Sequence, residues 1–379
     1  MLEVIRIYTI FTFFIYIILC SVVYMLCRDF LDKINEKKVE KLNKTLALEV
    51  ERQIKIIKLN NKLYKMDIDY IKSKICNKNY FKVFNETIIK LNKDNINKEY
   101  TKTYVKYFEE DILKTVRKYK NKDDIEKTFI VNLLGEYRLD NYELNEFLFN
   151  CLNTKSIFLR VETLKTFSKI GKTTNLIKAL QCISDKKQYI NGKILIDILD
   201  NFYGNFETLD KALLFKFYTF NNQIQKNIIE HLKNQNAEFA KDQVMSILTD
   251  ENLNKEVRIS AIKYFSKIHF NYAKEEIKKL LNHKEWEYRA ISASTLGKYK
   301  EKEIIEALLI SITDYNWYVR YNSAISLLNF NEDIIIDRVI KTNDKYSIDI
   351  LLYAMFSQEK ICYEDYLKET GKLEVDYSC

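Results

Sequence analysis

The sequence predicts an all-α fold: an α-solenoid of stacked helical hairpins, preceded by one transmembrane helix and a helical stalk. Two observations lead to this prediction. A basic residue recurs every 31 to 33 positions over most of the chain, and a period of that length is typical of stacked repeats. Near the N-terminus, residues 7–27 contain no charged side chain, which is typical of a helix that crosses a membrane.

Seven basic residues define the period, with gaps of 33, 33, 33, 32, 31 and 31 positions. We name them the basic repeat residues: Lys127, Arg160, Lys193, Lys226, Arg258, Arg289 and Arg320. Each begins a stretch with apolar residues three and four positions apart, which predicts a helix with one buried face. After Arg258 these apolar residues are Ile259, Ile262, Phe265 and Ile268. A second amphipathic stretch precedes the next basic repeat residue, so each unit is expected to be a helical hairpin that buries its apolar face by stacking on its neighbours.

Three of these units resemble HEAT repeats of the short bacterial type. Their sequences are SILTDENLNKEVRISAIKYFSKI (246–268), LLNHKEWEYRAISASTLGKY (280–299) and SITDYNWYVRYNSAISLLNF (311–330). The shared pattern is an apolar helix, an Asp-containing turn, Val-Arg, small residues and a Leu-Gly-like ending. The chain departs from it where Lys127, Lys193 and Lys226 replace the Arg, and the ending is intact only at Leu296–Gly297. Tetratricopeptide and ankyrin arrays have similar periods, but their signatures need Pro, which this chain lacks.

The resemblance covers residues 104–356 and implies about seven to eight HEAT-like repeats. It also implies that the repeated Arg pairs with a turn carboxylate of the neighbouring repeat, so Arg289→Ala should lower thermal stability. Contact with a ligand is the alternative role for this Arg. Asp314, six residues before Arg320, is placed to cap the following helix by accepting hydrogen bonds from its free amides.

The uncharged N-terminal segment is interpreted as an uncleaved membrane anchor. Residues 7–27 number 21, which as a helix span roughly 31 Å, enough for a bilayer core. A cleavable signal peptide is the main alternative, but it needs small residues at the cleavage site, and bulky residues stand there in YMLCRDF. A lipoprotein signal is disfavoured because Leu19 and Leu26 precede Cys20 and Cys27.

The charges that flank this segment predict its orientation. Arg6 is offset by Glu3 on one side, whereas residues 28–122 hold 25 basic and 14 acidic residues. The positive-inside rule therefore places the N-terminus outside the cell membrane and the repeats in the cytoplasm, as a single-pass protein. Residues 123–379 hold 35 basic and 38 acidic residues, so the positive charge is concentrated near the membrane, where it suits an anionic leaflet.

Five regions are expected along the chain. Residues 1–27 form the N-terminal transmembrane anchor, 28–65 a juxtamembrane helical stalk and 66–103 an irregular helical cap. Residues 104–356 form the HEAT-like array and 357–379 a C-terminal tail. A coiled-coil dimer seam in the stalk is an alternative, although its heptads are not regular.

The residue types that catalysis and metal binding require are not grouped in this sequence. The seven Cys contain no C-x-x-C pair, the three His stand apart from any nucleophile, and six Gly leave little scope for a phosphate loop. We therefore expect no catalytic residue, no cofactor, no metal site, no small-molecule substrate, and no enzyme activity.

One set of residues has the composition of a binding site. Trp286, Tyr288 and Arg289 in one repeat are matched in the next by Trp317, Tyr318 and Arg320. The two Trp are the only ones in the chain and should be neighbours, and Trp, Tyr and Arg dominate binding hot spots. The alternative is that both Trp pack between repeats.

The function favoured by the sequence is a membrane-anchored cytoplasmic scaffold that binds a protein partner on the solenoid surface. Resemblance to bacterial membrane proteins with one N-terminal helix and a HEAT array implies association with an envelope glycosyltransferase or a signalling complex. A nucleic-acid-binding protein similar to HEAT-like DNA glycosylases is the alternative, with a HEAT-like lyase less favoured. Because the repeats are near neutral, no nucleic acid is expected to bind.

Overall fold

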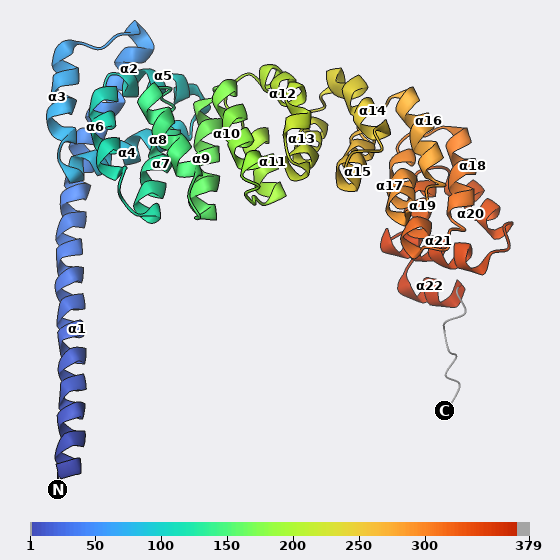
Figure 1. Cartoon of the computed structure of the whole chain (residues 1–379), viewed down its shortest axis with the longest axis horizontal. Coiled ribbons are helices and arrows are strands. Elements are labelled where there is room, and N and C mark those ends of the chain that lie inside the picture. Colours follow the sequence, from blue (N-terminus) through green and yellow to red (C-terminus); the bar gives the residue numbers. More distant parts are fainter. Residues whose placement is uncertain (1, 370–379) are drawn as a thin grey trace. The chain divides into compact units, whose positions relative to one another are not determined.

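The structure is a computed structural model that describes residues 2–369. Over this range it contains 22 α-helices with a few short 3-10 and π segments, and no strand (Figure 1). The all-α solenoid predicted from the sequence is therefore confirmed. The chain divides into two compact units, residues 1–172 and 173–379, a division that the sequence did not predict. Each unit is described by itself.

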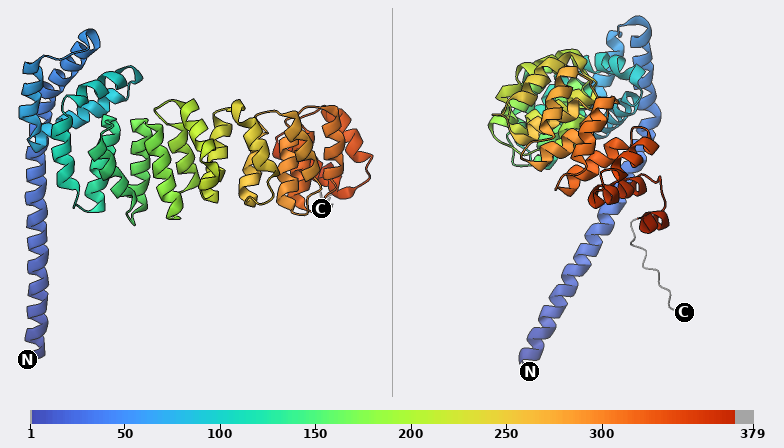
Figure 2. Two further views of the ribbon diagram at one scale, coloured as in Figure 1. Left: turned by 45° about the horizontal axis from the view of Figure 1, so that its top comes forward. Right: turned by 90° about the vertical axis from the view of Figure 1, so that its right-hand side faces the viewer.

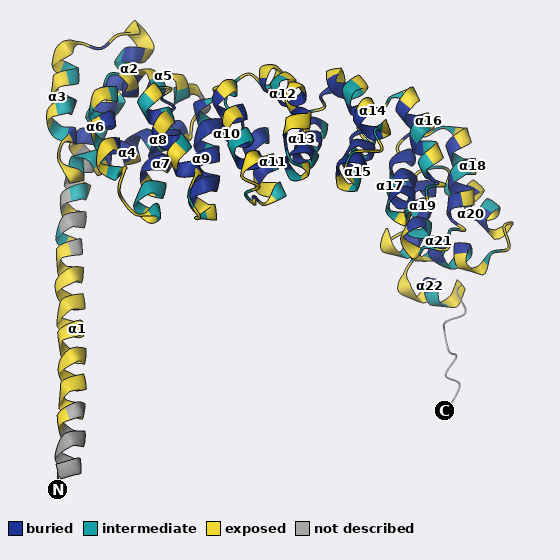
Figure 3. Ribbon diagram, in the orientation of Figure 1, coloured by how far each residue is buried: buried dark blue, intermediate teal, exposed yellow. Residues whose placement is uncertain are grey.

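The N-terminal helix α1 (Leu2–Leu42) is the longest in the chain. Its segment Phe11–Leu31 has a mean hydropathy of 2.0, and none of it is buried against the rest of the protein (Figure 3). This exposure distinguishes α1 from the core helix of a soluble protein. The chain therefore has one helix that is long and apolar enough to cross a membrane, a property that a signal sequence shares.

The remaining helices of the first unit follow α1 through a π segment, Asn43–Ala47. They are α2 (Leu48–Asn60), α3 (Lys65–Ile75), α4 (Lys78–Asn92), α5 (Lys98–Lys106), α6 (Glu109–Tyr119), α7 (Asp124–Tyr137), α8 (Tyr142–Leu152) and α9 (Ile157–Ile170). The predicted stalk is helical, but it does not stand apart. Val50, Ile54 and Ile57 are buried where α2 meets α4 and α5, so these residues are not available for a coiled-coil seam.

Helices α4, α7 and α9 run in the same direction. Asn92 at the end of α4 donates to the carbonyl of Glu136 at the end of α7, over 2.8 Å. Lys169 at the end of α9 pairs with the Glu136 carboxylate over 2.7 Å. The N-terminal ends of these three helices therefore share the opposite edge of the unit.

The second unit contains six helical hairpins and a closing helix (Figures 1 and 2). Its helices are α10 (Thr173–Asp185), α11 (Gly192–Asp200), α12 (Phe206–Phe215), α13 (Asn222–Asn234), α14 (Lys241–Thr249), α15 (Lys255–Tyr264), α16 (Asn271–Leu280), α17 (Trp286–Leu296), α18 (Lys302–Ser311), α19 (Trp317–Leu327), α20 (Glu332–Ile340), α21 (Lys345–Ser357) and α22 (Tyr363–Glu369). Helices α11, α13, α15, α17, α19 and α21 contact one another in succession. With α6–α7 and α8–α9, the described residues from α6 to α21 form eight hairpins, in agreement with the seven to eight repeats expected.

The apolar periodicity that predicted the hairpins corresponds to their buried faces. Ile262, Phe265 and Ile268 are buried and Ile259 is partly exposed. Helices α17 and α19 approach closely at Gly297, because a Cβ added there would lie 2.4 Å from the Cβ of Ser326. The one intact Leu-Gly ending is thus explained by packing that only Gly permits.

Asparagine starts many of these helices. Its side-chain oxygen accepts a hydrogen bond from a first-turn amide at Asn77, Asn141, Asn191, Asn205, Asn221, Asn254, Asn316 and Asn331. Such a cap satisfies an amide that has no partner inside the helix. The cap of α19 is Asn316, whereas Asp314 accepts from the amide of Asn316 and pairs with Arg289.

The C-terminal region differs from the predicted tail. Residues 363–369 form α22, which packs on α21 through Tyr366. The last predicted tail residues, 370–379, lie outside the described residues.

Candidate functional site

Eight aromatic rings in the second unit form an unbroken series of contacts, which we name the aromatic ridge. It consists of Trp286, Trp317, Tyr318, Tyr321, Tyr353, Phe356, Tyr363 and Tyr366, from α17, α19, α21 and α22. Trp286 stacks on Tyr318 with ring centroids 5.1 Å apart, and Trp317 meets the edge of the same Tyr318 at 5.2 Å. The two Trp are therefore joined through Tyr318.

The ridge combines exposed and buried rings. Trp286, Trp317 and Tyr318 are 36%, 42% and 53% exposed. The other predicted members of the set lie differently, because Tyr288 is only 3% exposed and Arg289 only 5%. The exposed surface of the predicted set is therefore formed by the two Trp and Tyr318, with Arg320 partly exposed beside them.

Arg289 is occupied by contacts inside the protein. Its Nε donates to Asp314 Oδ2 over 2.7 Å and one terminal nitrogen donates to Asp314 Oδ1 over 3.0 Å. The other terminal nitrogen donates to the carbonyl of His283 over 2.8 Å. These hydrogen bonds raise the pKa of Arg289 and connect its repeat to the next one. Pairing with the neighbouring turn carboxylate, which the HEAT resemblance implies, is what Arg289 does.

Two other basic repeat residues are held in related ways. Arg258 lies over the ring of Tyr288, 5.1 Å from its centroid, and donates to the carbonyl of Leu248 over 3.0 Å. Arg320 lies over the ring of Tyr346, 5.7 Å from its centroid. Each thus contacts an aromatic ring of the following repeat. This explains why Tyr288 is buried, since its ring covers the guanidinium of Arg258.

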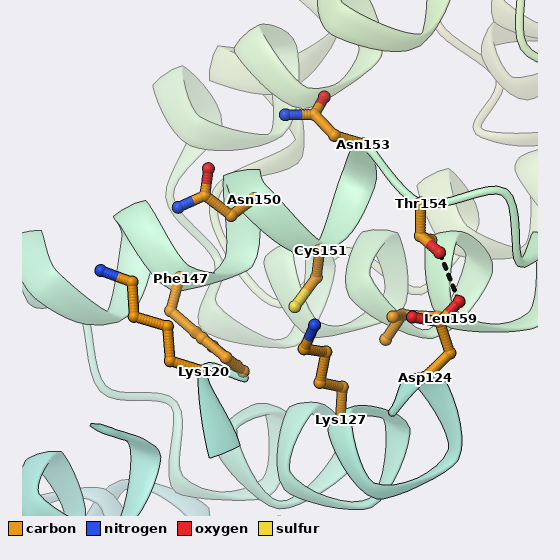
Figure 4. Close-up of a pocket in the computed structure, with 9 residues that line it drawn as sticks. All are labelled: Lys120, Asp124, Lys127, Phe147, Asn150, Cys151, Asn153, Thr154 and Leu159. Atoms are coloured by element: carbon orange, nitrogen blue, oxygen red, sulfur yellow. Dashed lines mark hydrogen bonds between the residues drawn. The ribbon is translucent and has the colours of Figure 1, made fainter. Parts of the chain in front are cut away.

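A cavity of about 260 Å³ lies in the first unit, where the start of α7 meets the end of α8 (Figure 4). It is lined by Lys120, Asp124, Lys127, Phe147, Asn150, Cys151, Asn153, Thr154 and Leu159. Figure 4 shows the ammonium group of Lys127 pointing toward Cys151, while Lys120 lies at the edge of the group. Burial raises the pKa of the Cys151 thiol to about 12, so the sulfur is neutral and unreactive at physiological pH.

The cavity surrounds Lys127, a basic repeat residue that lacks the carboxylate partner found at Arg289. Thr154 stands six residues before Arg160, as Asp314 stands six residues before Arg320. Its hydroxyl donates to Asp124 Oδ2 over 2.5 Å. Among the described residues, Lys127 and Lys120 have no hydrogen bond or ion pair to a carboxylate. Lys127 is nevertheless only partly exposed, so its charge is half-buried without a counterion.

Comparison with known proteins supports the fold alone. No family model matches the sequence, and no curated protein matches it. Among solved structures, the chain is similar to the CpcE–CpcF complex of phycocyanin lyase from Nostoc, with 16% identity, a TM-score of 0.31, and coverage of 62% of this chain and 92% of that one. It is also similar to human deoxyhypusine hydroxylase in complex with glycerol, with 12% identity, a TM-score of 0.29, and coverage of 78% and 97%.

These comparisons correct one expectation. The sequence analysis predicted that the chain is not an enzyme, yet both similar structures are those of enzymes, a lyase and a hydroxylase. At these TM-scores neither likeness assigns an activity or a catalytic residue to this chain.

His231 is the residue whose surroundings most resemble a catalytic group. Its Nδ1 lies 2.5 Å from Asp200 Oδ1, and its Nε2 lies 2.9 Å from Asp210 Oδ1. The ring is fully buried and both nitrogens are occupied, so no nitrogen faces a substrate. His231 therefore connects α11, α12 and α13 within the core. Among the described residues there is no group of three or more His, Cys, Asp or Glu that could hold a metal ion.

Proposed function

We propose that this protein is a membrane-anchored scaffold that presents helical repeats to a protein partner in the cytoplasm. The observation that carries the proposal is the exposure of Phe11–Leu31, a segment of 21 residues with a mean hydropathy of 2.0 and none of it buried. At about 25 cal/mol per Å² of apolar surface, leaving such a helix in water is very unfavourable. A lipid bilayer is the environment that removes this surface from water.

The orientation follows from charge. The residues that follow the anchor, 28–122, carry 25 basic and 14 acidic side chains. The positive-inside rule favours this flank on the cytoplasmic side. Protease added to sealed inside-out membrane vesicles should digest the repeats and leave a protected N-terminal fragment. Digestion of the repeats in intact cells would contradict this orientation, and a mature chain that lacks residues 7–27 by mass spectrometry would contradict the anchor.

The aromatic ridge is the surface proposed for the partner. Trp286, Trp317 and Tyr318 are large, partly exposed, and held rigid by their mutual stacking. Rigid aromatic side chains bind at a low entropic cost, which is one reason that they dominate binding hot spots. The ridge therefore supports binding of a protein segment that buries apolar side chains between the rings.

Site-specific photo-crosslinking in native membranes tests the partner surface. A photoreactive residue is placed at Trp286 or Trp317, with Tyr272 of α16 as a matched control, because Tyr272 is an exposed aromatic residue outside the ridge. A discrete crosslinked protein from both ridge positions, and none from Tyr272, supports the proposal. Equal products from all three positions, or none from the ridge, would count against it.

A further inference from the structure

We propose that the cavity at Lys127 binds a phosphate group, supplied by an anionic membrane lipid or by a soluble phosphate compound. The site is distinct from the aromatic ridge and lies in the other unit. It does not depend on the scaffold function proposed above. Only the lipid as the source of the phosphate rests on the proposed membrane anchor.

The first argument is the missing counterion. At Arg289 the carboxylate of Asp314 supplies two hydrogen bonds, of 2.7 and 3.0 Å. At Lys127 the residue in the position of Asp314 is Thr154, which carries no charge and donates its hydroxyl to Asp124. A half-buried ammonium group is favoured when an anion lies beside it. An external anion in the cavity would take the place that Asp314 fills in the other unit.

The second argument is space and donors. The cavity of about 260 Å³ is several times the volume of a water molecule, so it can hold a tetrahedral anion. Lys127 and Lys120 supply two positive charges, and the amide of Asn150 supplies a neutral donor. Asp124 also lines the cavity, and its negative charge opposes an anion. The site should therefore bind phosphate more tightly when that charge is removed.

The third argument is position relative to the membrane. Lys90 of α4 pairs with Glu51 of α2 over 3.3 Å, near the C-terminal end of α4. Since α1 and α2 follow the same course as α4, α1 leaves the unit at the N-terminal end of α4 (Figures 1 and 2). Helix α7 is parallel to α4, so its N-terminal end, with Lys127, lies at that same edge.

This edge lies close to the headgroup layer. Counting back twelve residues along both helices from the paired Lys90 and Glu51 places residue 39 of α1 level with residue 78, the first residue of α4. Residue 39 lies eight residues beyond Leu31, the end of the apolar segment. Eight helical residues span about 12 Å from the end of the apolar segment, about twice the roughly 6 Å thickness of one headgroup layer. Exposed lysines lie at the cavity: Lys120 lines it, and Lys155 follows Thr154 in the chain. They would attract anionic lipid to the site.

Lysine acylation footprinting of the full-length protein tests the proposal directly. The rate of Lys127 acylation is measured by mass spectrometry in a non-ionic detergent, with and without inorganic phosphate. It is measured again in nanodiscs of phosphatidylcholine, with and without phosphatidylglycerol. Binding should slow acylation of Lys127 about tenfold at saturation, as expected for a charge-assisted contact. Lys193 is the matched control, because it is an exposed lysine at the same repeat position in the other unit.

The variants set the direction of the effect. Asp124→Asn should lower the phosphate concentration needed for protection, and Lys120→Gln should raise it. Lys122→Gln is the control and should leave that concentration unchanged, because Lys122 pairs with Glu126. Protection by inorganic phosphate alone identifies a soluble ligand, and protection by phosphatidylglycerol identifies a lipid. If the protein proves not to be integrated into membranes and inorganic phosphate still protects Lys127, the proposed membrane anchor is wrong and the proposed phosphate site is supported. Unchanged Lys127 reactivity in both media, or equal protection of Lys193, would overturn the proposal.

Discussion

The same repeat position is used differently at Arg289 in the second unit and at Lys127 in the first. In the second unit Arg289 is buried and pairs with Asp314, whereas in the first unit Lys127 is half-buried and faces a cavity. The helices that carry the two residues begin alike, and what differs is the residue six positions before the next basic repeat residue. A stacked hairpin therefore fixes where this side chain lies, while the neighbouring turn decides whether its charge is satisfied within the protein.

The two units also differ in charge. Residues 1–172 hold 33 basic and 23 acidic side chains, whereas residues 173–379 hold 28 and 30. Both units contain ion pairs between neighbouring helices, such as Lys169 with Glu136 at 2.7 Å in the first and Lys226 with Glu256 at 2.8 Å in the second. The net positive charge of the first unit attracts external anions.

Breaking the internal ion pair should give the largest effect. Arg289→Ala leaves the Asp314 carboxylate partly buried without its partner, which should cost about 3 kcal/mol of unfolding free energy. Lys127→Ala, which removes no hydrogen bond, should change stability by less than about 0.5 kcal/mol. Chemical denaturation of both variants measures the difference. Equal losses would show that the two positions are equivalent.

Adding a methyl group at a close helix contact extends the comparison to one glycine in each unit. In the second unit Gly297→Ala forces its Cβ against Ser326 at 2.4 Å and should cost about 2 kcal/mol. In the first unit Gly135→Ala meets the side chain of Thr166 at 3.0 Å in the last turn of α7, where the helix preference of Ala, up to roughly 1 kcal/mol, offsets the strain. The denaturation midpoint should fall for the first variant only. Two equally destabilised variants would refute this reading of the packing.

Placing a carboxylate at position 154 should give Lys127 the kind of partner that Arg289 has in Asp314. The double variant Asp124→Asn with Thr154→Asp keeps a single acidic residue in the cavity and puts it where Asp314 lies in the other unit. A partly exposed ion pair with Lys127 should stabilise the protein by about 0.5 to 1 kcal/mol. The same variant should lose the protection of Lys127 by phosphate. Retained protection would mean that the carboxylate and the anion do not share a site.

The smallest effect concerns Cys151, which lines the cavity but should not react. Its pKa of about 12 keeps the thiolate fraction near pH 8 roughly a thousandfold below that of an unperturbed thiol. Iodoacetamide should therefore label the exposed Cys76 and Cys362 and leave Cys151 unmodified in the folded chain. Mass spectrometry after proteolysis measures the labelling of each. Rapid labelling of Cys151 would show that the cavity wall opens in solution.

Much of the fold was predictable because it repeats. The spacing of the basic residues predicted the hairpins. The apolar positions after Arg258 predicted which side chains of that repeat are buried. The N-terminal helix was also predictable as one that lies outside the core, because the core helix of a soluble protein rarely runs for 21 residues without a polar face. The boundary at residue 172 and the helix α22 carry no such signal, because they depend on packing between distant segments.

The sites were harder to predict than the fold. The sequence indicated that Trp286 and Trp317 lie close together, and stacking through Tyr318 joins them. It did not indicate that Tyr288 would be buried, since that follows from its contact with Arg258, thirty residues earlier. The cavity was missed as well. The signal that could have revealed it is the Thr at position 154, where the later repeat has Asp314.

The most direct test is a structure determined with tungstate, a heavy analogue of phosphate. It tests the claim that Arg289 already has its anionic partner inside the protein, whereas Lys127 can bind an external anion. We expect strong density beside the ammonium group of Lys127 and none beside Arg289, because Asp314 already occupies the anion position there. An empty cavity at Lys127, or equal density at both residues, would contradict it.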